Sequence, residues 1–261
     1  MNHKARKRFG QNFLHDQGII QQIIHGINPQ AGENIVEIGP GKGALTASLL
    51  DAAGKLNVIE LDRDLIPILQ NNLGNSENLH IHNVDALKYD FSQLSNKENS
   101  LRIVGNLPYN ISTPLLFHLL TFAYTIKDMH FMLQKEVVER ITAKPNSKTY
   151  GRLGVMLQYY CFTEKLFTVK PGAFSPAPKV DSAIVRLIPY QEPPVKVDNH
   201  EVFASIVSQC FSQRRKTLRN NLKNILNEDE INSLDIAPTA RAETLTIEQF
   251  ASLANLAITK S

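Results

Sequence analysis

The segment NIVEIGPGKGALT, Asn34–Thr46, decides the fold of this 261-residue chain. It begins with a short apolar run, as in a buried strand, and a glycine-rich turn then leads into a helical pattern. Gly39, Gly41 and Gly43 allow backbone angles that other residues avoid, and they let the chain approach a ligand closely. The segment therefore predicts a strand, a ligand-binding loop and a helix, which together begin a βαβ unit.

Further strands are predicted along the chain. Apolar runs at 56–61, 79–84, 101–105 and 129–133 alternate with helical patterns or a loop. Runs such as IVEI and IVG are apolar on both faces, which is typical of parallel strands covered by helices. We predict an α/β fold with a doubly wound sheet. The runs at 164–169 and 182–188 are joined without a helix, which predicts an antiparallel pair at the sheet edge.

A proline-rich segment, PYQEPPVKVD at 189–198, predicts a linker, because consecutive prolines interrupt both helices and strands. Only helical patterns follow it. We therefore expect two domains. Residues 1–190 form the α/β domain with a basic N-terminal arm, and residues 191–261 form a small all-α domain.

Two basic segments stand near the ends of a chain whose net charge is only +3. They read HKARKR and QRRKTLRNNLK. Such clusters usually form only a solvated face, but two of them in one chain fit a nucleic acid partner equally well, so charge alone leaves both interpretations open. Phosphate contacts without sequence choice are the expected role of their cations. The candidates are Arg6, Lys7, Arg8, Arg214, Arg215, Lys216 and Arg219.

The two cysteines, Cys161 and Cys210, stand far apart inside apolar runs, which predicts buried free thiols in a reducing compartment. The eight histidines are scattered, so no metal site is predicted. The N-terminus lacks the apolar core of a signal peptide, and no run of 18 apolar residues occurs. We expect a cytoplasmic protein without a membrane partner.

Carboxylates stand at the ends of the first three predicted strands, at Glu37, Glu60 and Asp85. A glycine loop with an acid about 20 residues later fits an NAD site, so an NAD-dependent oxidoreductase is one interpretation. Three acids disfavour a phosphate-bearing ligand. They suit S-adenosylmethionine, which is cationic at its sulfonium and ammonium groups and donates from its ribose hydroxyls and adenine amine. We expect Glu60 to bind the ribose and Asp85 the adenine amine, beside the cofactor loop of Gly39 and Gly41.

The segment NLPY, 106–109, follows the fourth predicted strand. Methylation of an exocyclic amine requires two acceptors for its N–H groups and an aromatic face to fix the base plane. The Asn106 amide oxygen and the Leu107 carbonyl are the candidate acceptors, because Pro108 restricts the backbone before it. Tyr109 is the candidate stacking residue. The segment also fits a strand-to-helix turn, and the two interpretations are compatible.

Five segments occur in an order that resembles the ribosomal RNA adenine dimethyltransferase family, and most closely its bacterial housekeeping members. They are RKRFGQNFL, EIGPGKGALT, VIELDRDL, NLPYNIS and FSPAPKVDS. The resemblance spans nearly the whole chain. It implies a Rossmann-like class I methyltransferase fold with a seven-stranded sheet and a small C-terminal helical domain. It also implies an enzyme that transfers methyl groups from S-adenosylmethionine to adenine N6.

The same resemblance implies roles for individual residues. Asn12 and Leu14 close over the cofactor, and Gly39 contacts its methionine part. Asn106 touches both the cofactor and the target base. Phe174 packs on the other side of an adenine that has left its stack, while its sequence context fits a core phenylalanine beside a proline turn equally well.

The implied substrate is a pair of adjacent adenosines in the loop of the 3′-terminal hairpin of 16S rRNA, in a partly assembled small subunit. The implied product is N6,N6-dimethyladenosine, formed by direct displacement without a general base, and the protein is expected to be a monomer. Two alternatives remain open within this interpretation. One is a non-catalytic ribosome assembly factor, and the other is a 23S rRNA adenine methyltransferase.

Overall fold

The computed structural model describes residues 11–74, 76–95 and 97–259. The chain divides into two compact units. The first contains the described residues up to Val138 together with Glu164–Pro189, and the second contains Glu139–Thr163 and the described residues from Tyr190 onward. The chain thus passes into the second unit next to the expected boundary at residue 190, but the second unit also includes 139–163. The division into domains 1–190 and 191–261 stays a prediction.

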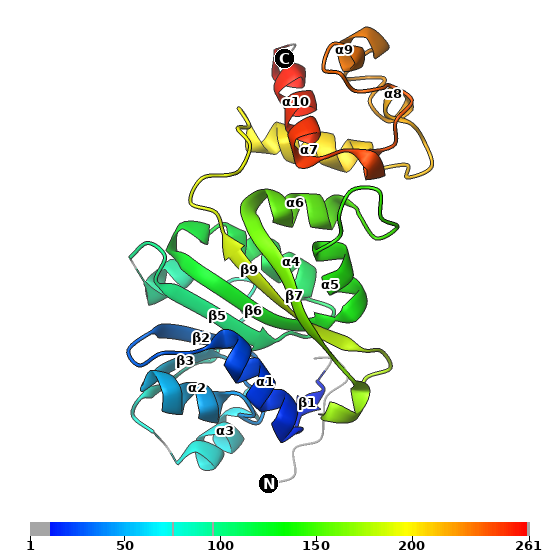
Figure 1. Ribbon diagram of the computed structural model, residues 1–261. Helices are drawn as coiled ribbons and strands as arrows, with labels where there is room; N and C mark the ends of the chain where they lie inside the picture. Colours follow the sequence, from blue (N-terminus) through cyan, green and yellow to red (C-terminus); the bar gives the residue numbers. More distant parts are fainter. Residues whose placement is uncertain (1–10, 75, 96, 260–261) are drawn as a thin grey trace. The chain divides into compact units, whose positions relative to one another are not determined.

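A seven-stranded sheet forms the centre of the first unit, in the order β4-β3-β2-β5-β6-β9-β7 (Figure 1). Neighbouring strands from β4 to β6 are parallel, and β9 runs antiparallel to β6. The structure confirms the predicted parallel sheet and places the last two predicted runs side by side. The strands are β2 (Asn34–Ile38), β3 (Leu56–Ile59), β4 (Leu79–His82), β5 (Leu101–Asn106), β6 (Ile126–Gln134), β7 (Cys161–Val169) and β9 (Ser182–Pro189).

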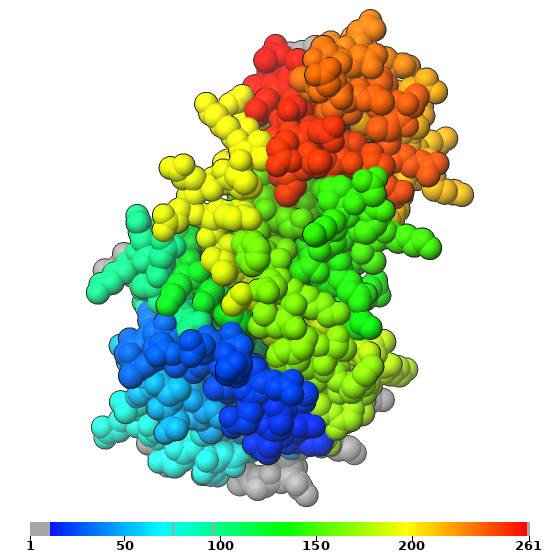
Figure 2. Space-filling model, in the orientation of Figure 1, coloured from blue at the N-terminus to red at the C-terminus, as the bar shows by residue number. Residues whose placement is uncertain are grey.

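Helices follow the strands at the predicted places. They are α2 (Thr46–Ala53), α3 (Ile66–Leu73), α4 (Ser112–Leu120) and α5 (Lys135–Ile141). An additional helix, α1 (Gln17–Ile27), was not predicted. Its buried face of Ile20, Ile23 and Ile27 joins the hydrophobic core that also contains Leu49 of α2. The segments of α1, α2 and α3 form a continuous surface of the first unit (Figure 2).

The order of the strands reverses between β2 and β5. The chain runs from β2 outward to β3 and β4, and it then returns to start β5 on the other side of β2. In a parallel sheet this reversal opens a crevice at the carboxyl ends of the two strands, which is where ligands bind. The strands approach closely there, because a Cβ atom on Gly105 would lie 2.5 Å from the Ile38 carbonyl oxygen. The glycine loop after β2 and the NLPY segment after β5 therefore meet at one place.

A small second sheet joins two segments that are far apart in the sequence. It pairs β1 (Phe13–Leu14) with β8 (Phe174–Ser175) in antiparallel register, with Leu14 opposite Phe174. The His15 amide extends the pairing by donating to the Ala173 carbonyl at 3.0 Å. Strands of two residues are too short for a periodic pattern, so this sheet was not predictable from the sequence.

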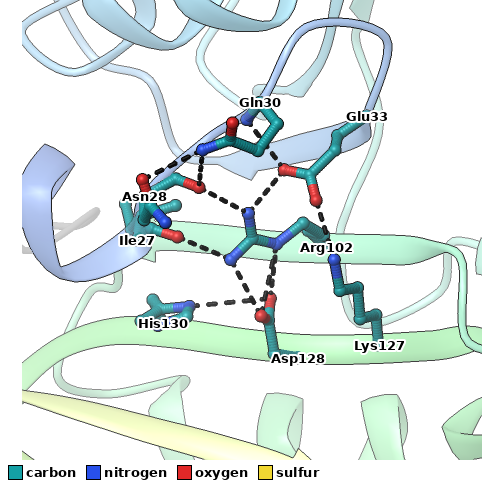
Figure 3. Close-up of polar contacts among 8 residues, drawn as sticks. All are labelled: Ile27, Asn28, Gln30, Glu33, Arg102, Lys127, Asp128 and His130. Atoms are coloured by element: carbon teal, nitrogen blue, oxygen red, sulfur yellow. Dashed lines mark hydrogen bonds and ion pairs between the residues drawn. The ribbon is translucent and has the colours of Figure 1, made fainter.

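A buried ion-pair cluster attaches the C-terminal end of α1 to the sheet (Figure 3). Arg102 of β5 donates to the Asp128 and Glu33 carboxylates and to the Ile27 carbonyl, the last at 2.6 Å. Arg102 is only 5% exposed, so these bonds offset the cost of burying its charge. His130 lies beside Asp128, and burial lowers the pKa of its imidazole to about 4. His130 is therefore neutral at physiological pH.

The second unit is mainly helical in both of its segments. Its helices are α6 (Arg152–Tyr160), α7 (His200–Cys210), α8 (Leu218–Asn221), α9 (Glu228–Asn232) and α10 (Ile247–Ile258). Helix α7 packs against α6 and α10, with the rings of Tyr159 and Phe203 4.5 Å apart. Helical patterns are expected throughout the chain after the linker, but within TLRNNLKNIL only the four residues of α8 form a helix.

Some smaller features complete the fold. Cys161 and Cys210 are buried and unpaired, as predicted. Short 3-10 turns occur at Phe91–Leu94, Ala123–Thr125, Pro171–Ala173 and Ala242–Thr244. Among the described residues, no helix is both long enough and apolar enough to cross a membrane.

Candidate active site

A pocket of about 340 Å³ lies at the carboxyl ends of β2, β3 and β5. This volume suits a ligand of nucleoside size. The pocket brings together most of the site residues predicted from the sequence. These are Asn12, Leu14, Gly39, Gly41, Glu60, Asp85, Asn106, Leu107, Pro108 and Tyr109.

The glycine loop forms the floor between β2 and α2. Gly39, Gly41 and Gly43 have φ angles of 70°, 59° and 91°, in the left-handed region that favours glycine. The Gly39 amide donates to the Ile59 carbonyl at 2.9 Å, which ties the loop to β3. A Cβ atom on Gly41 would lie 3.2 Å from the Phe13 ring, so the loop also packs closely against β1.

Glu60 is held in place at the end of β3. One carboxylate oxygen accepts from the Asp62 amide at 2.8 Å, and the other faces the Gly41 amide at 3.4 Å. Glu60 is 7% exposed, and this burial raises the pKa of its carboxyl above the usual value. Each oxygen has a second lone pair, so the carboxylate can still accept from two hydroxyl groups of a ligand.

Asp85 lies in the pocket wall after β4, and one of its oxygens accepts from the Leu87 amide at 3.0 Å. This bond shapes the turn that follows the strand. The carboxylate retains capacity for a further donor. Asp85 is therefore both a turn residue and a candidate acceptor for a ligand amine.

Glu37 is the third strand-end acid in the pocket, and the sequence pattern predicts no individual ligand contact for it. It is 2% exposed, and its Oε2 atom has no hydrogen-bond partner among the described residues. Burial, with a smaller contribution from the charge of Glu60, raises the pKa of Glu37 to about 7. A buried carboxylate without a full set of partners suits a cationic ligand group. Its position at the end of β2, two residues before Gly39, is the sequence feature that indicates its place in this pocket.

The NLPY segment is anchored on both sides. The Asn106 amide nitrogen donates to the Asn12 carbonyl at 3.1 Å, so the amide oxygen is the acceptor of that side chain. The Leu107 amide donates to the Met132 carbonyl at 3.2 Å. The Tyr109 hydroxyl lies 2.9 Å from the Ser182 hydroxyl, which fixes the direction of the phenol ring. Candidate acceptors and a candidate stacking ring are thus presented at one edge of the pocket.

Phe174 does not lie in the wall of this pocket. It is 4% exposed and belongs to the hydrophobic core with Leu14 and Ile184. The structure therefore brings Phe174 to the neighbouring segment β1 but not to the pocket itself. Its role beside the target base stays a prediction.

The predicted RNA-binding residues fall into two groups. Those of the N-terminal arm lie outside the described residues, namely Arg6, Lys7 and Arg8. Those near the other end gather around the turn between α7 and α8.

The cations of this turn differ in their surroundings. Arg214 donates to the Glu243 carboxylate at 3.0 Å and to the Lys148 carbonyl. Arg219 forms a 3.6 Å ion pair with Glu228. All four side chains are exposed, but those of Arg214 and Arg219 are engaged in these ion pairs. Arg215 and Lys216 are therefore better placed to contact phosphate groups.

The donor and acceptor groups of the pocket fit S-adenosylmethionine. Glu37, Glu60 and Asp85 line one cavity, as the strand-end pattern predicted. The only cationic side chain among the described lining residues is Lys42, whose ammonium lies 4.7 Å from the centre of the Phe13 ring. A pocket rich in acceptors suits hydroxyl, amine and sulfonium groups better than the pyrophosphate of NAD.

Comparison with known sequences agrees with this geometry. The family described as ribosomal RNA adenine dimethylase matches residues 2–259. The protein named Ribosomal RNA small subunit methyltransferase A of Saccharophagus degradans is 58% identical, over 97% of this chain and 94% of its own length. The protein of the same name from Hahella chejuensis is 56% identical, over 98% of this chain and 93% of its own length.

Solved structures give the same result. A dimethyladenosine transferase from Plasmodium falciparum superimposes with a TM-score of 0.76 at 28% identity, and covers 92% of this chain and 95% of its own. The 23S rRNA methyltransferase ErmE superimposes with a TM-score of 0.74 at 26% identity, and covers 94% and 99%. The fold is that of a class I methyltransferase with S-adenosylmethionine as its cofactor. The chain belongs to the ribosomal RNA adenine dimethylase family.

Proposed function

We propose that this enzyme methylates N6 of two adjacent adenosines in the loop of the 3′-terminal hairpin of 16S rRNA, to give N6,N6-dimethyladenosine. Asn106 and Leu107 line the acid-rich pocket at the place where the strand order reverses between β2 and β5. This observation supports the proposed chemistry. Support for small-subunit RNA comes from relatives at 56% and 58% identity that bear that name.

The NLPY segment is the part of the pocket where methyl transfer is proposed to take place. The Asn106 amide oxygen and the Leu107 carbonyl accept the two N–H groups of the adenine amine and hold its nitrogen in line with the methyl group. Tyr109, fixed by Ser182, stacks on the base. S-adenosylmethionine, when bound, supplies an electrophilic methyl group. The nitrogen becomes acidic after methylation and loses its proton to water, so no general base is required.

The acids at the strand ends are the proposed cofactor contacts. Glu60 accepts from the two ribose hydroxyls, because its buried carboxylate retains a free lone pair on each oxygen. Asp85 accepts from the adenine amine of the cofactor. Gly39, Asn12 and Leu14 enclose the methionine part, with Gly41 in the same loop.

Phe174 is proposed to cover the second face of the target base. Its ring is buried with Leu14 and Ile184, so this role requires the ring to turn outward when RNA enters. Tyr109 is already at the edge of the pocket and needs no such movement.

The proposed partner is a partly assembled small subunit, bound by a monomer in the cytoplasm. Arg215 and Lys216 are exposed and contact phosphate groups. Arg214 and Arg219, which are paired with Glu243 and Glu228, add positive charge beside them. The proposed contacts of the N-terminal arm are those of Arg6, Lys7 and Arg8.

Mapping of methylated adenosines on ribosomal RNA tests the substrate assignment. Ribosomal subunits from a strain that lacks this protein are incubated with the purified enzyme and S-adenosylmethionine. We expect methylation of the 16S hairpin loop and none of 23S rRNA. Methylation of 23S rRNA alone would favour the activity named for the similar structure of ErmE and would contradict the proposal.

A second candidate function is that of an assembly factor that binds subunits without the need for methylation. The exposed basic turn around Arg215 favours binding of ribosomal RNA as a function in itself. A Glu60→Ala protein that fails to methylate but still restores subunit maturation would support this second function.

A further inference from the structure

The chain segment 11–15, here called the N-terminal strap, crosses the cofactor pocket and is attached on several sides. Gln11, Asn12, Phe13 and Leu14 all line the pocket. The strap pairs with β8 at Leu14, and its Asn12 carbonyl accepts from Asn106. These two attachments lie toward the side of the pocket where the target base is proposed to bind.

The opposite end of the strap is attached to the cofactor side. The Gln11 side-chain amide donates to the Asp62 carboxylate with 2.9 Å between Nε2 and Oδ2. Asp62 is 2% exposed, and its other oxygen faces the Asp64 amide at 3.3 Å. A hydrogen bond to a buried, charged acceptor is stronger than one between neutral groups.

Asp62 is also directly connected to a proposed cofactor contact. Its backbone amide donates to Glu60 Oε1 at 2.8 Å, so the acid proposed to bind the ribose and the acid that holds the strap belong to one turn after β3. The floor of the site and the strap above it are therefore fixed to the same three residues, 60–62.

We infer that the hydrogen bond between Gln11 and Asp62 holds the N-terminal strap closed over the cofactor, which makes both of them positioning residues for cofactor binding and release. The inference rests on the proposed placement of the cofactor in this pocket. Because the strap covers the ligand, breaking this bond lets the strap open and lets the cofactor leave faster. The affinity for the cofactor is the quantity that reports on this bond, because the strap also holds Asn106 through the Asn12 carbonyl and its opening disturbs the NLPY segment as well.

Exchange of the donor and acceptor groups tests the inference. In Gln11→Glu two carboxylates face each other, so the strap is repelled. In Asp62→Asn the bond survives, because the Gln11 amide can turn over and accept from the new amide. In the double variant Gln11→Glu with Asp62→Asn, the new amide donates to the new carboxylate and still accepts from the Asp64 amide. The double variant therefore restores the bond with its polarity reversed.

Two measurements are made on each variant. Calorimetry gives the dissociation constant of S-adenosylhomocysteine, and hydrogen exchange gives the protection of residues 11–15 in the ligand-free protein. Gln11→Glu should bind at least about tenfold more weakly and lose protection in the strap. Asp62→Asn and the double variant should bind within about threefold of the wild type.

Two results would overturn the inference. One is a Gln11→Glu protein that binds as tightly as the wild type, and the other is a double variant as weak as Gln11→Glu. Gln22→Glu is the matched control, since it makes the same change on an exposed position of α1. If the strap variants have no effect while Glu60→Ala loses affinity, only the role of the strap fails. If Glu60→Ala also binds normally, the placement of the cofactor fails.

Discussion

Arg102 and Asp128 form a two-point ion pair inside the sheet, with 2.9 Å between Nε and Oδ1 and 2.8 Å between Nη2 and Oδ2 (Figure 3). The same guanidinium group also donates to the Glu33 carboxylate and to the Ile27 carbonyl at the end of α1, so it attaches α1 to the sheet. Helix α1 follows the N-terminal strap directly. The ion pair thus anchors the element that leads away from the cofactor pocket.

Replacement of Arg102 by methionine should lower the free energy of unfolding by about 3 to 5 kcal/mol, because it leaves the buried Asp128 carboxylate without its two-point partner. Urea denaturation measures this change. Lys127→Met is the control, since Lys127 binds Glu33 in the same cluster but its side chain is 50% exposed. The control should lose less than about 1 kcal/mol. Equal losses in the two variants would show that burial of the pair has no particular importance.

Glu60→Ala should weaken the binding of S-adenosylmethionine by about 1.5 to 3 kcal/mol, the range for hydrogen bonds to a charged group. The reason is the loss of the buried carboxylate proposed to accept from the ribose hydroxyls. Calorimetry provides the measurement, with the exposed acid variant Glu77→Ala as the control. Unchanged affinity in Glu60→Ala would rule out the ribose assignment.

The raised pKa of Glu37 predicts a pH-dependent stability. Its pKa rises from 4.5 to about 7 on folding, so the folded chain holds this proton more tightly than the unfolded chain. Relative to Glu37→Gln, the wild type should therefore lose stability as the pH rises from about 4.5 to about 7, by about 3 kcal/mol at most.

Denaturation of the wild type and of Glu37→Gln at pH 5 and pH 8 tests this dependence. The difference between the two proteins is the relevant quantity, because His130 titrates in both of them and with the opposite sign. The stabilisation by glutamine should be larger at pH 8. A difference that stays the same at the two pH values would contradict the assigned shift.

Much of the fold was predictable because parallel strands between helices have a continuous apolar pattern. NIVEI and LRIVG gave β2 and β5, and their strand-end motifs met as expected. The β1–β8 pair was not predictable, since two residues give no period. The placement of Phe174 in the core and the partners of Arg214 depend on packing between distant segments, which no local pattern reports. The Gln11–Asp62 bond was not predictable either, because it also joins two segments that are far apart in the sequence.

The exposed basic turn predicts a salt-dependent affinity for RNA. Arg215→Glu with Lys216→Glu should weaken binding to small subunits and flatten its dependence on salt, because fewer phosphate groups are neutralised. Affinity for the cofactor should not change. Binding assays over a series of salt concentrations measure the slope.

The matched control for this slope is Lys55→Glu with Lys97→Glu. Both lysines are exposed, and they precede β3 and β5 at the amino edge of the sheet, away from the pocket. The control pair should leave the slope nearly unchanged. If both pairs flatten it equally, the effect comes from net charge, and the turn has no special role.

The predicted product follows in part from the proposed role of Asn106. After one transfer the adenine nitrogen retains a single N–H group, so a site that needs two strong donors would lose the intermediate. A neutral amide oxygen loses less than a carboxylate when one donor disappears, because hydrogen bonds to charged groups are about twice as strong. The singly methylated base can turn its methyl group away and present its nitrogen again.

Mass spectrometry of nucleosides tests the central claim most directly. Small-subunit RNA from a strain that lacks the enzyme is treated with the purified protein and excess S-adenosylmethionine, and then digested. We predict N6,N6-dimethyladenosine as the end product, with the monomethyl form only as a transient. Monomethyladenosine as the sole end product of an active enzyme would contradict the account.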